Sequence, residues 1–152
     1  MSCFCGPLVP APRYFFTVRL HDPASDLLIR HIDLLRHSVR LARQCHPFAI
    51  EDAVILPSRL HMIWSLPPGK TDYGKRWQMI KATFARHIPH ETVGRAVPRV
   101  WQRRYWEQVI ASDGDYQLYA DLIAEAPVSD GLAKRIGDWP YASHAKLQAG
   151  SR

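Results

Sequence analysis

Two stretches of the sequence carry apolar residues at helical spacing, and each is followed by a segment with the composition of a β-strand. In the first stretch, from about Leu27 to Gln44, apolar residues recur at steps of three and four. The second stretch has the same spacing, and its apolar residues are Trp77, Ile80, Phe84 and Ile88. The two patterns predict amphipathic helices, each of which must bury one face against a neighbouring layer.

Four segments are aromatic, β-branched or alternating, as strands are: residues 13–20, 48–56, 59–66 and 99–110. A third helix is expected from about Asp115 to Glu125, ended by Pro127. The order β-α-β-β-α-β-α predicts an α+β fold of the ferredoxin-like, split βαβ type. That fold is a four-stranded antiparallel sheet with helices on one face.

A chain of 152 residues can bury a single core without a disulfide or a structural metal, so one domain is expected. Residues 1–12 are predicted to be a flexible leader, residues 13–146 the folded domain and residues 147–152 a loose tail. The apolar runs are far shorter than the roughly 20 residues of a membrane span. No signal-peptide pattern is recognisable, so a cytoplasmic protein without a membrane partner is expected.

The charge balance favours a polyanionic partner. Twenty Lys and Arg residues against 14 Asp and Glu residues give a net charge of +6. Such a chain attracts nucleic acid through release of counterions, although many basic domains bind no nucleic acid. If it binds DNA, it is expected to be associated with the nucleoid.

Arg99, Arg103 and Arg104 are interleaved with Trp101, Tyr105 and Trp106. Positive charges beside aromatic rings suit single-stranded nucleic acid, because the cations contact phosphates and the rings stack on bases. The alternative is that the rings are core residues and the arginines form a solvated face. Four further cations, at helical positions, fit either a solvated ridge or contacts to a DNA stem: Arg36, Arg40, Lys75 and Lys81.

Several segments resemble, in the same order, those of REP-associated tyrosine transposases, a branch of the single-tyrosine HUH transposases. They are YFFTVRL, HIDLLR, HPFAIEDAVILPSRLHMIWSLPPG, RWQMIKATFAR, VWQRRYWEQVI and DWPYAS. The resemblance covers about residues 13–144. It implies recognition of hairpin and single-stranded DNA. It also implies a divalent metal held by a His-hydrophobic-His pair and one polar side chain of the last helix. In this chemistry a helix-borne tyrosine attacks the phosphate and forms a 5′-phosphotyrosine.

The sequence departs from that family pattern at three positions. The family's Leu-Pro-x-His-Leu-His is matched by residues 56–61, so that His61 is kept but Arg59 replaces the first histidine. An arginine is always protonated and cannot ligate a cation, but Arg59 is a candidate for contact with a DNA phosphate instead. The family's Asp-Tyr-Ile-x-x-Asn-Pro-Val is matched by residues 121–128. There Leu122 replaces the nucleophilic tyrosine and Ala126 replaces the third ligand.

The first hypothesis is therefore a monomeric protein that binds hairpin or single-stranded DNA but cleaves it poorly or not at all, and has no cofactor. The second is an active transposase that uses Mg²⁺ or Mn²⁺, with relocated ligands and Tyr119 as the nucleophile. In that case His61 would be a remnant metal ligand. The third is a basic protein-interaction module without DNA.

Overall fold

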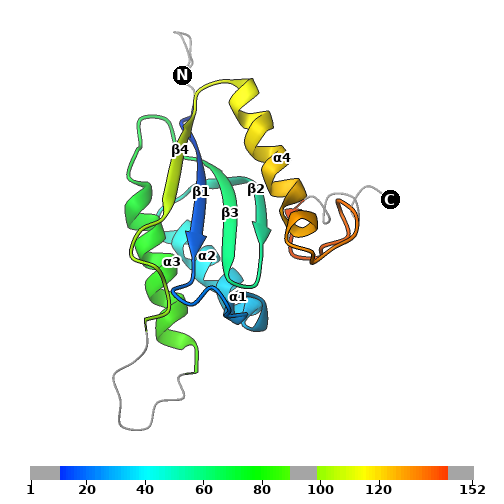
Figure 1. Cartoon of the computed structure of the whole chain (residues 1–152). Coiled ribbons are helices and arrows are strands. Elements are labelled where there is room, and N and C mark those ends of the chain that lie inside the picture. The colour runs from blue at the N-terminus through cyan, green and yellow to red at the C-terminus, as the bar shows by residue number, and fades with distance from the viewer. Residues whose placement is uncertain (1–10, 90–98, 144–152) are drawn as a thin grey trace.

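A computed structural model describes residues 11–89 and 99–143, and Figure 1 shows the arrangement of the elements. In chain order they are β1 (Arg13–Arg19), α1 (Leu27–Arg30), α2 (Ile32–Cys45), β2 (Ala49–Ile55), β3 (Arg59–Ser65), α3 (Tyr73–His87), β4 (Trp106–Ile110) and α4 (Asp113–Ser129). The predicted leader lies almost wholly outside the described residues, as does the predicted tail.

The four strands form one antiparallel sheet in the order β2-β3-β1-β4. The two central strands, β1 and β3, pair along their full length, from Arg13 opposite Ser65 to Arg19 opposite Arg59. This order is that of a split βαβ fold, because β3 lies between β1 and β2, the strands that the first crossover connects. The predicted fold class is confirmed.

The larger core lies between the sheet and the helices α2 and α3. Alternate residues of β1 and β3 point to this side, including Phe16, Val18 and Trp64, and all are fully buried. Trp64 stacks on Phe48 and on Trp77, with ring centroids 4.0 and 4.3 Å apart. The four apolar positions that predicted the second helix are all buried here.

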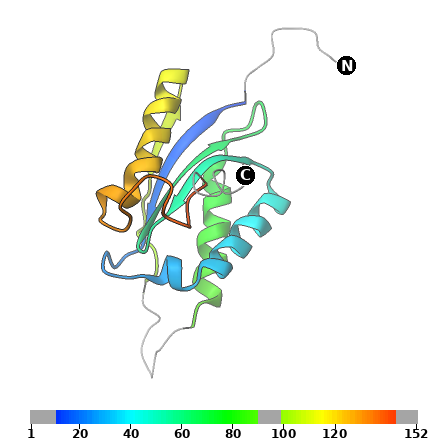
Figure 2. The ribbon, with the colours of Figure 1, turned by 90° about the vertical axis from the view of Figure 1, so that its right-hand side faces the viewer.

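The fourth helix, α4, covers the opposite face of the sheet. Figure 2 shows α4 on one side of the sheet and α2 and α3 on the other. Ile123 and Ala126 of α4 pack there against Phe15 and Ile63. The expectation of helices on one face therefore holds for α1, α2 and α3 but not for α4. The residues between the strand face and α4 form a second, smaller core.

The first predicted helix is divided. The backbone of His31 leaves the helical region, with φ −115° and ψ 41°, and so separates α1 from α2. Leu28 of α1 is fully buried, and its N–H donates to the Pro57 carbonyl at 3.3 Å. The short helix is therefore held against the β2–β3 turn, in a direction that one continuous helix would not allow.

The prediction that Pro127 ends the last helix is wrong. The helix continues to Ser129 with Pro127 in its final turn. Proline at that place removes one backbone donor only, and the end is closed by the Asp130 N–H, which donates to the Ala126 carbonyl at 3.0 Å.

The predicted strand over residues 99–110 is formed only in its second half. Trp101 makes an isolated bridge to Leu20, and its indole N–H donates to the Lys81 carbonyl at 3.0 Å. The backbone therefore follows the buried indole toward α3 and joins the sheet at Trp106. Across residues 11–89 and 99–143, no helix combines the length and apolar character that crossing a bilayer requires.

Candidate functional site

The face of the sheet near α4 brings together the residues that correspond to the family's catalytic pocket. His61 of β3 lies opposite Thr17 of β1 and is buried. Phe15 stacks on His61, with centroids 5.7 Å apart, and Tyr119 of α4 stacks on Phe15 at 4.4 Å. The last helix therefore reaches the His61 side of the sheet through a row of three rings.

Both ring nitrogens of His61 are hydrogen-bonded. The Arg59 Nε–H donates to His61 Nε2 at 3.3 Å. Because a guanidinium can only donate, Nε2 must carry the lone pair and Nδ1 the proton. Nδ1–H then donates to the Thr17 Oγ1 at 2.7 Å. His61 is thus fixed as one neutral tautomer.

The electrostatics of the pocket favour the same neutral form. Burial, followed by the positive charges of Arg59 and Arg19, lowers the pKa of His61 from 6.5 to about 4, and Asp130 opposes the shift. A cation would therefore meet two arginines and an imidazole whose lone pair is already engaged.

Arg59 is also bound to the end of α4. Its two terminal nitrogens donate to the two carboxylate oxygens of Asp130, at 2.6 and 3.0 Å. Asp130 follows the last residue of α4, where a negative charge is unfavourable because of the helix dipole. The two-pronged ion pair offsets that charge, so all of the Arg59 nitrogens have partners within the chain.

The two α4 positions that the family uses for catalysis are differently placed. Leu122 is 40% exposed, whereas Ala126 is buried among the apolar residues under the helix. Tyr119 is partly buried through its stacking on Phe15. None of the described residues forms a hydrogen bond with the Tyr119 hydroxyl, so the structure pairs it with no general base.

The family's metal does not fit the residues of this pocket. Within residues 11–89 and 99–143, no three His, Cys, Asp or Glu side chains are grouped closely enough to hold a metal ion. The Arg59 N–H occupies the lone pair of His61 that a metal would need.

The segment of mixed arginines and aromatics divides into buried rings and exposed cations. Trp101 is buried and Tyr105 packs on Phe16, so Trp101 is a core residue that no base can reach. The three arginines, Arg99, Arg103 and Arg104, are exposed. The core alternative is thus observed for Trp101 and in part for Tyr105, whereas Trp106 is 60% exposed and is not a core residue. The arginines remain available to a partner.

The basic residues of α3 differ in how deeply they are buried and in how many hydrogen bonds they make within the chain. Lys81 Nζ donates to the Gln102 carbonyl at 2.9 Å, and burial lowers the pKa of this lysine. Lys75 lies on the surface, 3.7 Å from Asp72. Arg76, between them in sequence, is buried and donates to the carbonyls of His46 and Pro47 and to Asp72.

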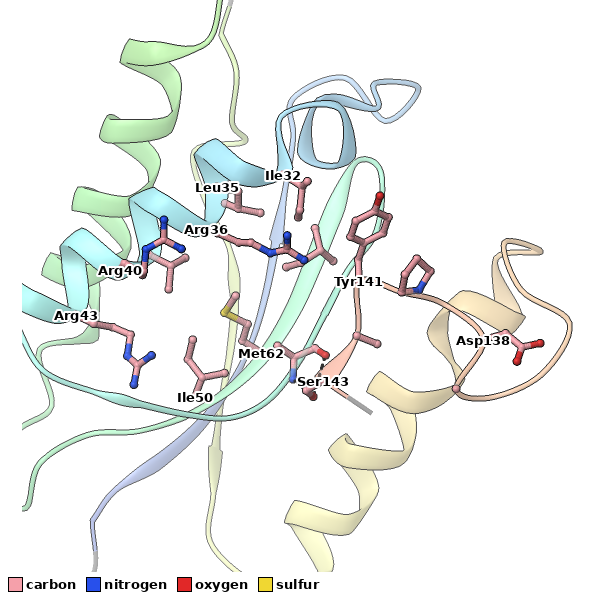
Figure 3. A pocket seen from close by; sticks show the side chains of 16 residues that line it. Ile32, Leu35, Arg36, Arg40, Arg43, Ile50, Met62, Asp138, Tyr141 and Ser143 are labelled. Carbon is pink, nitrogen blue, oxygen red and sulfur yellow. Dashed lines mark hydrogen bonds between the residues drawn. The ribbon is translucent and has the colours of Figure 1, made fainter. Parts of the chain in front are cut away.

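The arginines of α2 lie together beside a groove. Figure 3 shows Arg36, Arg40 and Arg43 along one wall, on the α2 side of the sheet. Arg36 lies 3.6 Å from Asp33, an exposed pair. The structure therefore places these arginines and the exposed cations of residues 99–104 in different parts of the fold.

Sequence reasoning did not select three residues near His61: Thr17, Arg19 and Asp130. Thr17 and Arg19 alternate with buried residues along β1, so the strand period could have placed them on the His61 face. Asp130 had no local signal, because it is 71 residues from Arg59.

Comparisons with known proteins show which proteins the chain is similar to. No family model matches the chain. A REP-associated tyrosine transposase of Escherichia coli (strain K12) is 36% identical over 130 residues, which cover 86% of this chain and 74% of the relative. A putative REP-associated tyrosine transposase of Haemophilus influenzae is 33% identical over 144 residues, or 90% of this chain and 82% of the relative.

Solved structures give the same result. The structure of a REP-associated tyrosine transposase bound to a REP hairpin matches 99% of this chain and 87% of its own, at a TM-score of 0.83 and 33% identity. A putative transposase from Deinococcus radiodurans, at 14% identity and a TM-score of 0.55, shares the fold. With this identity over most of its length, the chain belongs to the family of REP-associated tyrosine transposases.

Proposed function

We propose that this protein binds hairpin or single-stranded DNA and does not cleave it. The observation that carries the proposal is the hydrogen bond from the Arg59 Nε–H to His61 Nε2. It takes the lone pair that a catalytic metal would use and leaves a positive charge at that place.

The positions of α4 support the same conclusion. Attack on a phosphodiester needs a nucleophile in line and a Lewis acid on a non-bridging oxygen. Leu122 offers neither an oxygen nor a proton to transfer, and Ala126 offers no ligand. Three of the family's four catalytic side chains are therefore chemically unable to take their roles.

DNA binding is supported by the charge and by the relatives. The net charge is +6, and Arg99, Arg103 and Arg104 form an exposed cationic group close in sequence to β4. A relative of 33% identity has been solved with a REP hairpin bound. Binding through phosphates needs these cations and no metal, so we propose that Mg²⁺ and Mn²⁺ are not required for DNA binding. We also propose that the protein acts as a monomer on chromosomal DNA.

One experiment separates the possible functions. The protein is mixed with a labelled REP-type hairpin, with Mn²⁺ or with EDTA, and run on native and denaturing gels. A native shift in both conditions without a covalent band is the expected result. A covalent band that Tyr119→Phe abolishes would contradict the proposal and identify an active enzyme. Absence of a shift at low salt would contradict DNA binding itself.

A further inference from the structure

The exposed apolar side chains of the protein are gathered in one part of the chain. Among residues 11–89 and 99–143, every exposed large apolar side chain lies between positions 106 and 136. They are Trp106, Val109, Leu118, Leu122, Val128, Leu132 and Ile136. Single exposed apolar residues are common on soluble proteins, but a concentration of them indicates an interaction surface.

The last helix, α4, carries apolar residues on two faces. Its inner face, with Ile123 and Ala126, is buried against the sheet. On its outer side Leu118 is 62% exposed and Leu122 is 40% exposed. The two leucines are four residues apart, so they lie one above the other on the same face. In Figures 1 and 2 the sheet lies on one side of α4, and no helix or strand of the described residues covers the other side.

The same part of the chain is acidic, in a protein that is otherwise basic. Residues 105–133 contain six of the 14 Asp and Glu residues and none of the 20 Lys and Arg residues. This stretch therefore carries a charge of −6, whereas the rest of the chain carries +12.

Two of these carboxylates lie beside the exposed leucines. Asp121 and Glu125 are exposed, and they follow Leu118 at steps of three and four residues. Neither forms an ion pair within the described part of the chain, where Asp121 accepts a hydrogen bond from the Gln117 side chain at 2.7 Å. We call Leu118, Asp121, Leu122 and Glu125 the outer face of α4.

Charge decides which kind of molecule can cover this outer face. DNA phosphates and anionic lipid headgroups would meet carboxylates of their own sign. A second copy of the chain is disfavoured for the same reason. Among the residues that the structure describes, exposed large apolar side chains occur only in and beside the acidic stretch, so a symmetric contact through them would bring two acidic stretches together. A partner that carries apolar and basic residues on one face would bury the leucines and pair with the carboxylates.

We propose that the outer face of α4 binds a basic amphipathic helix of another protein. The apolar residues of such a helix recur every three to four positions, as Leu118 and Leu122 do, and its flanking cations reach Asp121 and Glu125. The inference goes beyond the proposed function and does not depend on DNA binding.

The test measures binding of a fluorescently labelled designed peptide to the full chain by anisotropy. The peptide has about 18 residues, enough to form a helix, with leucines at helical spacing and lysines at the other positions. Two further peptides are controls. One has the same residues in scrambled order, and the other has glutamates in place of the lysines. The parent protein should bind the basic amphipathic peptide and neither control.

The first double variant removes the apolar part of the face. We expect Leu118→Gln/Leu122→Gln to weaken binding of the basic amphipathic peptide by about 10-fold or more, because both leucines are buried in the complex. The control Val109→Gln/Ile136→Gln removes exposed apolar side chains outside α4 and should stay within about twofold of the parent protein.

The second double variant removes the charges of the face. We expect Asp121→Asn/Glu125→Gln to weaken binding about 3- to 10-fold at low salt and less at high salt. The control Asp26→Asn/Asp33→Asn removes the same charge from two exposed pairs outside α4, so its affinity should stay close to that of the parent protein.

Three results would overturn the inference. The first is absence of peptide binding to the parent protein. The second is equal binding of the scrambled or the acidic peptide, which would show that helical spacing or charge is not recognised. The third is a loss in either α4 variant no larger than in its control, which would place the peptide elsewhere. Urea unfolding of each variant checks that the fold is kept, and if the leucine variant does not fold, the carboxylate variant decides.

Discussion

Arg59 and Asp130 are joined by two parallel hydrogen bonds, 2.6 and 3.0 Å long, between the first residue of β3 and the residue that follows α4. The pair connects the two elements that carry the family's catalytic residues. Its side chains are only 22% and 28% exposed, so solvent screens it less than a surface pair. Together with the Arg59–His61 hydrogen bond, this pair gives the polar groups beside His61 partners within the chain.

Replacing Asp130 by Asn should destabilise the fold and strengthen DNA binding. The variant breaks a two-pronged charged interaction, and we expect a loss of about 1–2 kcal/mol in the free energy of unfolding, measured with urea. The released Arg59 can then contact phosphate, so affinity for a REP-type hairpin should rise several-fold. Asp26→Asn, which removes an equal charge from an exposed pair with Arg30, should change neither quantity appreciably.

His61 should make stability depend on pH between about 6.5 and 4. Its pKa is lowered to about 4 in the folded state, so the unfolded chain takes up the proton first as the pH falls. The stability that the neutral His61 contributes is fully present above pH 6.5 and is lost as the pH approaches 4. Between pH 7.5 and 4.5 the loss is roughly 2–3 kcal/mol.

The carboxylates of the protein titrate in part of the same interval, so the measurement needs a reference. Urea unfolding of the parent protein and of His61→Gln at both pH values isolates the histidine. The variant should lose less stability on acidification than the parent. Equal losses would show that His61 does not remain neutral in the fold.

Restoring the family residues should restore cleavage if the backbone has kept its geometry. The triple variant Arg59→His, Leu122→Tyr and Ala126→Asn should form a covalent adduct with a REP-type hairpin in Mn²⁺, seen on a denaturing gel. The double variant without Leu122→Tyr should bind DNA but form no adduct. Ala126 is buried, so absence of an adduct in a folded triple variant would mean that α4 has shifted.

Replacing either of two neighbouring cations of α3 should affect the free energy of unfolding to very different extents. Arg76→Ala leaves the carbonyls of His46 and Pro47 without their donor and should cost about 2–4 kcal/mol of unfolding free energy. Lys75→Ala removes an exposed charge and should change it by less than about 0.5 kcal/mol. A large loss at Lys75 would contradict its surface position.

The exposed arginines near β4 should set the salt dependence of DNA binding. The double variant Arg103→Gln/Arg104→Gln should reduce the slope of log affinity against log salt by roughly 1.5, since each phosphate contact contributes about 0.7–0.9. Lys81→Gln should leave the slope unchanged, because its ammonium is held by the Gln102 carbonyl. Reversed results would place the DNA over α3.

The sequence predicted the elements of the sheet and of its main core because their signals are local. The aromatic and β-branched residues of β1 and the alternation of β3 indicated strands, and helical spacing from Trp77 to Ile88 indicated the buried side of a helix, which is buried as expected. The burial of both faces of β1 and β3 was not predicted. There are two exceptions. The break at His31 accompanies a tertiary contact of α1 with the β2–β3 turn, and α4 passes through Pro127 because a proline in the final turn removes only one backbone donor.

The sequence by itself determined the fold class. Through the family resemblance it also indicated the kept His61 and the three changed positions, because residue identity alone decides whether a side chain can ligate or attack. Only the tertiary structure decided what the replacements do. It placed the Arg59 guanidinium between His61 and Asp130 and buried Trp101. It also lined a groove with the α2 arginines. These are relations between residues far apart in the chain, and the periodicity of a single strand or helix carries no information about its distant partners.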